Sequence, residues 1–211
     1  MTTPLSPVTL TGAIVSLVPL TAGDATKLAD VGLEPVLWRL QPRQIRTPKE
    51  MQAYVDAALA EQRAGASLPF TITRRADGAV IGSTRYMDLA LAHKRLEIGA
   101  TWLTPGAQRS GANVEAKLLL LEYAFEQLAI RKVVLKTEVA NVQSRTAIRA
   151  LGATEEGIFR HHLLADDGRV RDMVYYGILA SDWPEVRPRL ESRLARGGRA
   201  SFQQQPSGTR G

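Results

Sequence analysis

The sequence predicts an α+β protein with one central, mixed and mostly antiparallel sheet of about seven strands and helices on both faces. Three features predict this class. Several strand-like runs come early, one long helix then links two strands as a parallel crossover requires, and a hairpin follows near the end. With 211 residues and 45% hydrophobic side chains, the chain is long enough to build one buried core without disulfides.

The first half of the chain combines strand patterns with two helix starts. The expected strands span residues 8–20, with a turn at Gly12, and residues 69–74, 80–87 and 95–103. Asp24 is suited to cap a short helix that ends near residue 31, before a proline-interrupted segment over 32–47. Thr47, Pro48 and Glu50 form a capping-box pattern, which predicts the start of a second helix.

The second half of the chain predicts the crossover and the hairpin. The expected strands span residues 132–139, about 154–165 and 171–179, and the expected helices begin near residues 113, 141 and 181. Spacings of four and three define the apolar face of the first of these helices: Val114, Leu118, Leu121, Phe125 and Leu128. Asn141 is suited to cap the second. We expect a single domain over residues 1–196 and a disordered tail, rich in Gly, Gln, Ser and Arg, over 197–211.

Composition excludes several kinds of site. The chain has no cysteine, which excludes disulfides, thiolate catalysis and cysteine-ligated zinc. Its three histidines, two of them adjacent, do not have the spacing of a metal site. No apolar run approaches the ~18 residues of a membrane span, and the first basic residue is Lys27, unlike the start of a signal peptide. We therefore expect a cytoplasmic protein with no metal and no membrane partner.

The formal net charge of +6 is concentrated near the C-terminus. From Arg187 onward, six arginines stand against one glutamate. Such a basic end binds nucleic acid or ribosomes in some proteins and is a solvated surface in others. Aromatic side chains that would stack on bases are not interleaved among the arginines of residues 187–199. We therefore favour the solvated surface and expect no nucleic-acid partner.

The stretch from Glu97 to Asn113 carries the strongest functional signal. A strand ends at Leu103, a loop with Gly106 and Gly111 follows, and a long helix opens at Asn113. Unpaired N–H groups at a helix start favour an anion such as phosphate. The Lys-Ser/Thr pair of a Walker loop and the GxGxxG pattern of a dinucleotide loop are both absent. The residues alone leave two readings, a phosphate-binding loop and an ordinary strand–loop–helix connection.

The segment Gln108-Arg109-Ser110-Gly111-Ala112-Asn113 resembles the Gln/Arg-x-x-Gly-x-Gly/Ala pyrophosphate loop of the GNAT superfamily of acetyltransferases. The surrounding sequence resembles the RimJ/RimL-like branch, which acetylates the N-termini of ribosomal proteins and other amines. The matching pieces cover about residues 8–195 and include Leu96-Glu97-Ile98-Gly99, Trp102-Leu103, Glu115-Ala116-Lys117, Asn141-x-x-Ser144, Leu151-Gly152-Ala153 and Arg171-Asp172. Asn113 departs from the Gly or Ala of the motif, and its residue type suits a helix N-cap.

The resemblance implies acetyl-CoA as cosubstrate. In the superfamily, two parallel strands splay apart and the pantetheine arm enters between them; here these are the strands over 95–103 and 132–139. The expected cofactor contacts are the backbone at Trp102 and Leu103, the loop residues Gln108, Arg109, Ser110, Gly111, Ala112 and Asn113, and the side chain of Asn141. Asn141 also has a plainer role as a helix cap, and the two roles are compatible.

The resemblance further implies direct attack of an amine on the thioester. Glu97 is the candidate general base, with a structural glutamate as the alternative, and a backbone N–H near the end of its strand would meet the oxyanion. Many GNAT enzymes carry a tyrosine acid seven residues after the asparagine, where this chain has Ile148. No acid is therefore carried over. Ser144 is the candidate for a hydrogen bond to the sulfur, with a bond to its own helix as the alternative.

The acceptor pocket is expected between the segment over 32–47, the strand over 80–87 and the closing hairpin. Its candidate walls are Trp38, Tyr86, Arg160, His161 and His162. The acceptor would be a primary amine on a protein N-terminus or a small molecule. The competing hypothesis is a noncatalytic protein that keeps the fold and binds acetyl-CoA or docks on ribosomal RNA. Assembly as a homodimer stays open.

Overall fold

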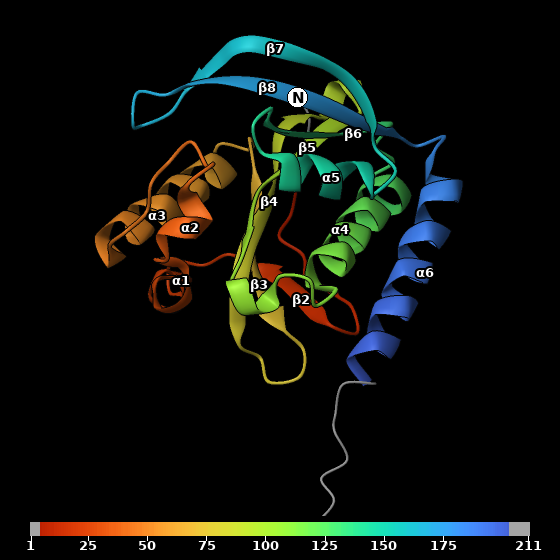
Figure 1. Ribbon diagram of the computed structural model, residues 1–211, viewed down its shortest axis with the longest axis horizontal. Coiled ribbons are helices and arrows are strands. Elements are labelled where there is room, and N and C mark those ends of the chain that lie inside the picture. The colour runs from red at the N-terminus through yellow and green to blue at the C-terminus, as the bar shows by residue number, and fades with distance from the viewer. Residues whose placement is uncertain (1–4, 203–211) are drawn as a thin grey trace, which may run out of the picture.

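The computed structural model describes residues 5–202 of the chain, with side chains described through residue 196. Its strands form a single eight-stranded sheet in the order β1-β2-β3-β4-β5-β6-β8-β7 (Figure 1). All neighbouring strands run antiparallel except β5 and β6, which are parallel. The expected mixed, mostly antiparallel sheet is confirmed, with eight strands in place of about seven. The strands are β1 (Leu10–Thr11), β2 (Val15–Pro19), β3 (Leu68–Arg74), β4 (Val80–Ala90), β5 (Arg95–Leu103), β6 (Lys132–Glu138), β7 (Thr154–Leu164) and β8 (Val170–Leu179).

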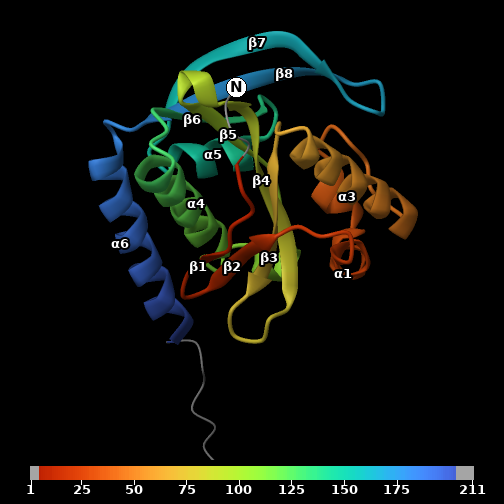
Figure 2. The same ribbon diagram turned by 180° about the vertical axis from the view of Figure 1, so that it is seen from behind.

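Helices cover both faces of this sheet, as expected. Figures 1 and 2 show α1, α2 and α3 on one side and α4 and α6 on the other, with α5 beside α4. The helices are α1 (Asp24–Gly32), α2 (Pro35–Trp38), α3 (Pro48–Arg63), α4 (Ala112–Glu122), α5 (Val142–Arg149) and α6 (Trp183–Phe202). A π-helical turn over Tyr123–Gln127 continues α4 toward β6.

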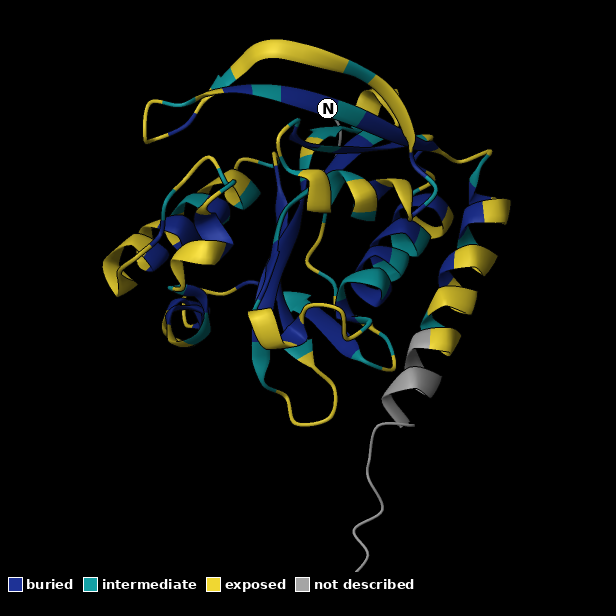
Figure 3. Ribbon diagram, viewed as in Figure 1, coloured by how far each residue is buried: buried dark blue, intermediate teal, exposed yellow. Residues whose placement is uncertain are grey.

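Each face of the sheet has its own apolar cluster. The larger cluster joins the sheet to α4, α5 and α6 and includes Phe70, Leu96 and Leu120. The smaller cluster joins α1, α2 and α3 to the other face around Trp38 and Trp102. Figure 3 shows the central strands buried between these layers, whereas β7, at the edge of the sheet, is largely exposed. The central strands therefore sit on a rigid two-sided core.

The starts of α3 and α1 follow local sequence chemistry. The Thr47 hydroxyl accepts a hydrogen bond from the Glu50 N–H, and the Glu50 carboxylate accepts one from the Thr47 N–H, which confirms the expected capping box of α3. Asp24 is the first residue of α1 and not its N-cap, which is Gly23. The Asp24 carboxylate instead accepts hydrogen bonds from the backbone N–H and hydroxyl of Thr21. It fixes the chain as it enters the helix.

Helices α4 and α6 differ from their expected boundaries. Helix α4 begins at Ala112 after the N-cap Gly111, which corrects the expectation that Asn113 caps it. Gly111 takes this position because its φ of +88° is a left-handed conformation that glycine adopts without strain. Helix α6 continues to Phe202, past the expected domain end at residue 196. The rest of the expected disordered tail, residues 203–211, lies outside the described residues.

The parallel strands β5 and β6 pair over a short distance only. Their paired residues are Arg95 with Lys132, Leu96 with Val133, and Glu97 with Val134. Beyond these pairs, β5 stays paired with β4 and β6 stays paired with β8. The two strands therefore separate from each other while each keeps its outer neighbour. The expected splay is present, and it opens directly after Glu97.

The carboxylate of Glu115, on α4, holds the turn between β1 and β2. It accepts hydrogen bonds from the backbone N–H groups of Ala13, Ile14 and Val15 at 2.7–2.9 Å, and the residue is buried. The turn has no space for a side chain at Gly12, where a Cβ would lie 2.4 Å from the carboxylate carbon. This contact joins the first strands of the sheet to the helix that begins at the loop over 104–111.

Replacing Glu115 with glutamine is expected to lower the free energy of unfolding by about 2–4 kcal/mol, because an amide NH₂ would face buried N–H donors that then lack an acceptor. Urea unfolding followed by circular dichroism measures this loss. The matched control is Glu122→Gln, which removes an exposed ion pair with Arg187 and is expected to cost less than about 1 kcal/mol. Equal small losses in both variants would contradict the role of Glu115 in holding the turn.

Candidate active site

A β-bulge lies in β5 just beyond the point where β6 departs. Ser83 of β4 pairs with Trp102 and Arg85 pairs with Gly99, so the single residue Thr84 faces both Ala100 and Thr101. Ala100 has a φ of +48°, which is uncommon for a residue with a side chain. The peptide groups of this part of β5 that point toward β6 have no strand to pair with. The bulge thus presents backbone hydrogen-bonding groups inside the gap.

The loop between β5 and α4 is folded by its own side chains. The Gln108 side-chain amide donates to the Leu103 carbonyl at 3.2 Å, and the Ser110 hydroxyl donates to the Ala107 carbonyl at 2.7 Å. Arg109 has a left-handed backbone, with φ of +62°, and an exposed side chain. Gln108 and Ser110 therefore shape the loop, and the Arg109 guanidinium extends from it into solvent.

The start of α4 presents several backbone N–H groups together. Within the described residues, no backbone acceptor is present for the N–H groups of Arg109, Ser110, Gly111, Asn113 and Val114. They lie at the positive end of the helix dipole, where phosphate groups bind well. The residues present therefore fit the pyrophosphate of a CoA molecule, as the sequence predicts for Arg109 to Asn113.

Glu97 lies at the mouth of the gap, on the face of the sheet opposite α4. Its side chain is only 3% exposed, and its carboxylate is 2.8 Å from the Lys136 ammonium of β6. Gly99 leaves space for this carboxylate, because a Cβ there would lie 2.7 Å from Glu97 Oε1. Burial raises the pKa of Glu97 above its ordinary range, and the Lys136 charge partly offsets this rise. Glu97 is thus a buried carboxylate with a raised proton affinity beside the opening in the sheet.

An aromatic cluster from the closing hairpin continues outward from Lys136. The Lys136 ammonium lies 5.7 Å from the centre of the Tyr175 ring, and Tyr175 packs edge-on against Phe159 and His162. The Tyr175 hydroxyl and His162 Nε2 are 2.9 Å apart. Phe159 is half exposed. The hairpin therefore places a partly open aromatic surface next to the Glu97–Lys136 pair.

Helix α5 brings the predicted Asn141 and Ser144 to the end of β6. The Asn141 side-chain oxygen accepts the Ser144 backbone N–H at 3.0 Å, so the expected cap is confirmed. The Asn141 amide NH₂ stays available as a donor for a ligand. Within the described residues, the Ser144 hydroxyl makes no bond to its own helix. Ile148, at the position where the resemblance would place a tyrosine acid, is buried in the larger apolar cluster.

Two of the predicted acceptor walls are core residues, which corrects their expected role. Tyr86 is fully buried on the α4 side, with its hydroxyl donating to the Leu120 carbonyl. Trp38 is 2% exposed and donates through its indole N–H to the Gly32 carbonyl. Both fill apolar space because large aromatic rings dominate core packing. Arg160 is exposed on β7, and His162 reaches the aromatic cluster.

The side chain of Trp102 does not face the predicted cofactor loop. It packs 5.6 Å from Trp38, between ring centroids, in the smaller apolar cluster. Its backbone pairs with Ser83 of β4. The bulge at Ala100 and Thr101 explains this placement, because one extra residue shifts the alternation of side chains between the two faces. Only the backbone of Trp102 remains available for the predicted role.

Sequence reasoning missed two lysines near the gap. Lys136 lies in the middle of the buried strand β6, and Lys117 lies on the buried face of α4. Each directly adjoins an apolar run: Lys136 follows Val133–Leu135, and Lys117 precedes Leu118–Leu121. A buried charged residue is unusual at such a position. The unusual position of these lysines could be read from the sequence. Their partners could not, because Glu97 and Thr101 lie on β5, far away along the chain.

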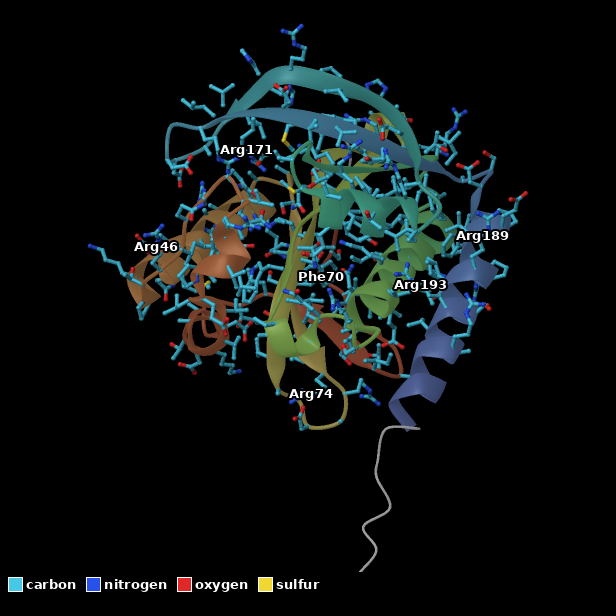
Figure 4. All side chains as sticks on the ribbon, viewed as in Figure 1. Arg46, Phe70, Arg74, Arg171, Arg189 and Arg193 are labelled. Atoms are coloured by element: carbon cyan, nitrogen blue, oxygen red, sulfur yellow. The ribbon has the colours of Figure 1, made fainter. Side chains whose placement is uncertain are left out.

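The basic C-terminal segment is partly neutralised in the structure. Arg187 pairs with Glu122, Glu126 and Glu191, and Arg189 lies 3.6 Å from Glu185. Figure 4 shows both Arg189 and Arg193 on α6, on the far side of the molecule from α1–α3, and the Arg193 guanidinium donates to the Ala150 carbonyl at 3.3 Å. The side chain of Arg199 and all of Arg210 lie outside the described residues. These pairs favour the solvated reading of this segment.

Figure 4 also shows Arg171 where β8 passes the segment between α2 and α3. Its guanidinium donates to the carboxylate of Glu138 and to the Leu40 carbonyl, at 2.8 and 2.9 Å. Burial raises the pKa of Glu138, but its hydrogen bonds with Arg169 and Arg171 outweigh this and lower the pKa overall. This buried cluster holds the closing hairpin against the helices of the opposite side of the gap.

Comparison with known families agrees with this geometry. The family model of the acetyltransferase (GNAT) domain matches residues 15–154, so the chain belongs to the GNAT acetyltransferase family. The GNAT fold binds acetyl-CoA. Among the described residues, none of the helices has both the length and the apolar character that a membrane crossing needs. The described part of the chain also contains no group of three or more side chains placed to hold a metal ion.

Individual relatives place the chain more narrowly. The "Putative ribosomal N-acetyltransferase YdaF" of Bacillus subtilis (strain 168) is 32% identical over 107 residues, which are 51% of this chain and 57% of that relative. The structure of a GCN5-related N-acetyltransferase from Brucella melitensis is 27% identical with a TM-score of 0.83, covering 91% of this chain and 87% of that chain. Mycobacterium smegmatis RimJ in complex with CoA-disulfide shares the fold at 22% identity and a TM-score of 0.71, covering 89% of this chain and 93% of that chain. These similarities agree with the RimJ/RimL-like branch.

The variant Asn113→Asp is expected to weaken CoA binding about tenfold while it stabilises the protein slightly. Asn113 lies in the first turn of α4, where a negative charge is favourable to the helix by roughly 0.3–1 kcal/mol but repels a bound pyrophosphate. Calorimetric titration with acetyl-CoA and thermal unfolding measure the two effects. The control Thr26→Glu adds the same charge to the exposed first turn of α1 and should leave CoA affinity unchanged. Unchanged affinity in Asn113→Asp would contradict the loop assignment.

Proposed function

We propose that this protein is an acetyl-CoA-dependent N-acetyltransferase that moves an acetyl group to a primary amine by direct attack on the thioester. The observation that carries this proposal is the position of Glu97. Its buried carboxylate stands at the residue where β5 and β6 separate, on the face of the sheet opposite the phosphate-type loop of α4. A donor bound along α4 and an acceptor entering from the other face would meet beside it.

The relatives support an amine acceptor. One is named a ribosomal N-acetyltransferase, and another is described as a GCN5-related N-acetyltransferase. The aligned region spans little more than half of the first, so its activity comes to this chain as part of the proposal. The acceptor we propose is the amine of a protein N-terminus or of a small molecule, received between the Glu97–Lys136 pair and the aromatic side chains of Phe159, His162 and Tyr175.

The cosubstrate supplies an acetyl thioester as the acyl donor. Glu97 accepts the proton that the amine loses, directly or through water, so that the nitrogen lone pair can bond to the carbonyl carbon. Backbone N–H groups of the β5 bulge donate hydrogen bonds to the carbonyl oxygen and stabilise the negative charge that develops on it. That charge returns to re-form the carbonyl as the carbon–sulfur bond breaks, and the bonding pair leaves on sulfur. Asn141 and the loop over residues 109–114 orient the donor throughout.

Replacing Glu97 with glutamine is expected to lower kcat by about 10²–10⁴-fold, the usual contribution of a general base, with little change in acetyl-CoA affinity. Release of free CoA thiol with a panel of amines measures turnover. In the wild type, kcat should fall as the pH drops through the pKa of Glu97, which burial raises, because the protonated carboxyl cannot accept a proton.

In the Glu97→Gln variant, kcat should no longer fall as the pH drops through this range. The control Glu185→Gln changes an exposed carboxylate on α6, and we expect it to keep both kcat and the fall of kcat at low pH. Wild-type turnover with an unaffected Glu97→Gln variant would reject Glu97 as the base. No turnover with any amine would favour the noncatalytic alternative.

Replacing Ser144 with alanine is expected to reduce kcat about two- to tenfold without loss of stability. The Ser144 hydroxyl has no bond within the described residues that its removal would break, whereas its N–H contact with Asn141 is kept by alanine. Steady-state kinetics and thermal unfolding measure the two quantities. An unchanged kcat would remove Ser144 from the mechanism and leave it as a helix residue only.

A further inference from the structure

Lys117 is a buried lysine without a carboxylate partner. It lies on α4, is 6% exposed, and its ammonium donates to the Thr101 hydroxyl at 2.6 Å. In the described part of the chain, no Asp or Glu lies within ion-pair distance of it. Lysines are almost never fully buried unless they are paired. The fold therefore keeps a charged group in a costly position, which points to a role beyond packing.

The ammonium group of Lys117 lies at the bulge of β5. Thr101 is one of the two residues that face Thr84 across the bulge, and its hydroxyl lies 2.8 Å from the Thr84 hydroxyl. The Thr101 oxygen accepts from Lys117, and its hydroxyl also lies 3.4 Å from the Gly99 carbonyl, to which it can donate; either hydroxyl can be the donor between Thr101 and Thr84. A continuous chain of hydrogen bonds thus runs from α4 through β5 to β4. This chain of hydrogen bonds holds the bulge from the face of the sheet that α4 covers.

We propose that Lys117 is a positioning residue for acetyl transfer: its ammonium group, held on Thr101, fixes the β5 bulge and places a positive charge behind the N–H groups that meet the thioester carbonyl. This inference rests on the proposed function and adds to it the source of charge for the oxyanion. Lys117 acts through Thr101 and transfers no proton itself. Its contribution is electrostatic, and fixed charges act strongly in a site that excludes water.

The other charged side chains near the bulge do not supply this positive charge. Glu97, on β5, is the acidic group whose charge acts on Lys117, and Lys136 of β6 is already paired with Glu97. Arg85 of β4 turns to the other face, where it pairs with Glu61 of α3. Tyr86, also of β4, stays neutral because burial raises its pKa well above the ordinary value. Burial lowers the pKa of Lys117 to about 7, and the Glu97 charge opposes this.

The test uses Lys117→Met, which keeps the length of the side chain and removes the charge. We expect kcat to fall at least tenfold, KM for acetyl-CoA to change less than threefold, and the melting temperature to stay the same or rise. In the wild type, kcat should also fall above the pKa of Lys117 as the ammonium is lost, and Lys117→Met should lack this alkaline limb. A purely structural lysine would instead lower the melting temperature and leave the pH profile unmoved.

Two further variants sharpen the test. Thr101→Val removes the hydroxyl with little change of shape, and the double variant should be no slower than the slower single variant if Lys117 acts through Thr101. Leu120→Met is the control for repacking on the same face of α4 and should leave kcat unchanged. Additive losses in the double variant would overturn the link between Lys117 and Thr101.

A readout without an acceptor separates this inference from the proposed function. Infrared spectra of bound acetyl-CoA labelled with ¹³C at the carbonyl report how strongly the protein polarises that bond. We expect a lower stretching frequency in the wild type than in Lys117→Met. Equal frequencies with normal binding would overturn the role of Lys117 and leave the proposed function standing. If acetyl-CoA does not bind at all, both fall together.

Discussion

The structure depends on the parting of β5 and β6 after three residue pairs. Parallel strands in a sheet normally stay paired, because unpaired peptide groups in the interior cost free energy. Here each strand keeps its outer neighbour, β4 or β8, so the sheet opens without losing its two halves. The opening exposes peptide groups in the middle of a rigid fold. That arrangement suits a narrow, amide-bearing chain such as pantetheine, which can satisfy the exposed groups of both strands.

The same opening explains why charged residues sit inside an otherwise apolar centre. Glu97 and Lys136 are paired across β5 and β6 on one face, and Lys117 reaches the opening from the other face. Removing either partner of a buried pair leaves an uncompensated charge, which is strongly destabilising. Such groups persist where their reactivity or their field is used. Their convergence on one short stretch of β5, Glu97 to Thr101, ties them to a single site.

The sequence predicted the elements better than it predicted the orientation of individual side chains. Strand β5 was expected over 95–103 and has those bounds, since alternation and the flanking loop signals are local properties. Tyr86 was expected in the acceptor pocket, but it lies on the face of β4 toward α4, where its ring is fully buried. The side chain of Trp102 lies on the opposite face because the bulge at Ala100 shifts the alternation along β5, and no local pattern announces a bulge. Asn113 was taken for the cap because its residue type is favourable, but Gly111 supplies the left-handed backbone that this loop requires.

The missing acid and the buried lysine have a common explanation. Position 148 holds an isoleucine that packs in the core, so α5 offers no phenol to protonate the departing sulfur. A thiol with a pKa near ~8.5 is a tolerable leaving group as the thiolate, so protonation is not the main demand of the reaction. The greater demand is the negative charge on the carbonyl oxygen as the amine adds. In the mechanism we propose, the fold meets that demand from the β4–β5 side of the opening, through the bulge and Lys117. Asn141 and Ser144, on the β6–α5 side, then position the donor.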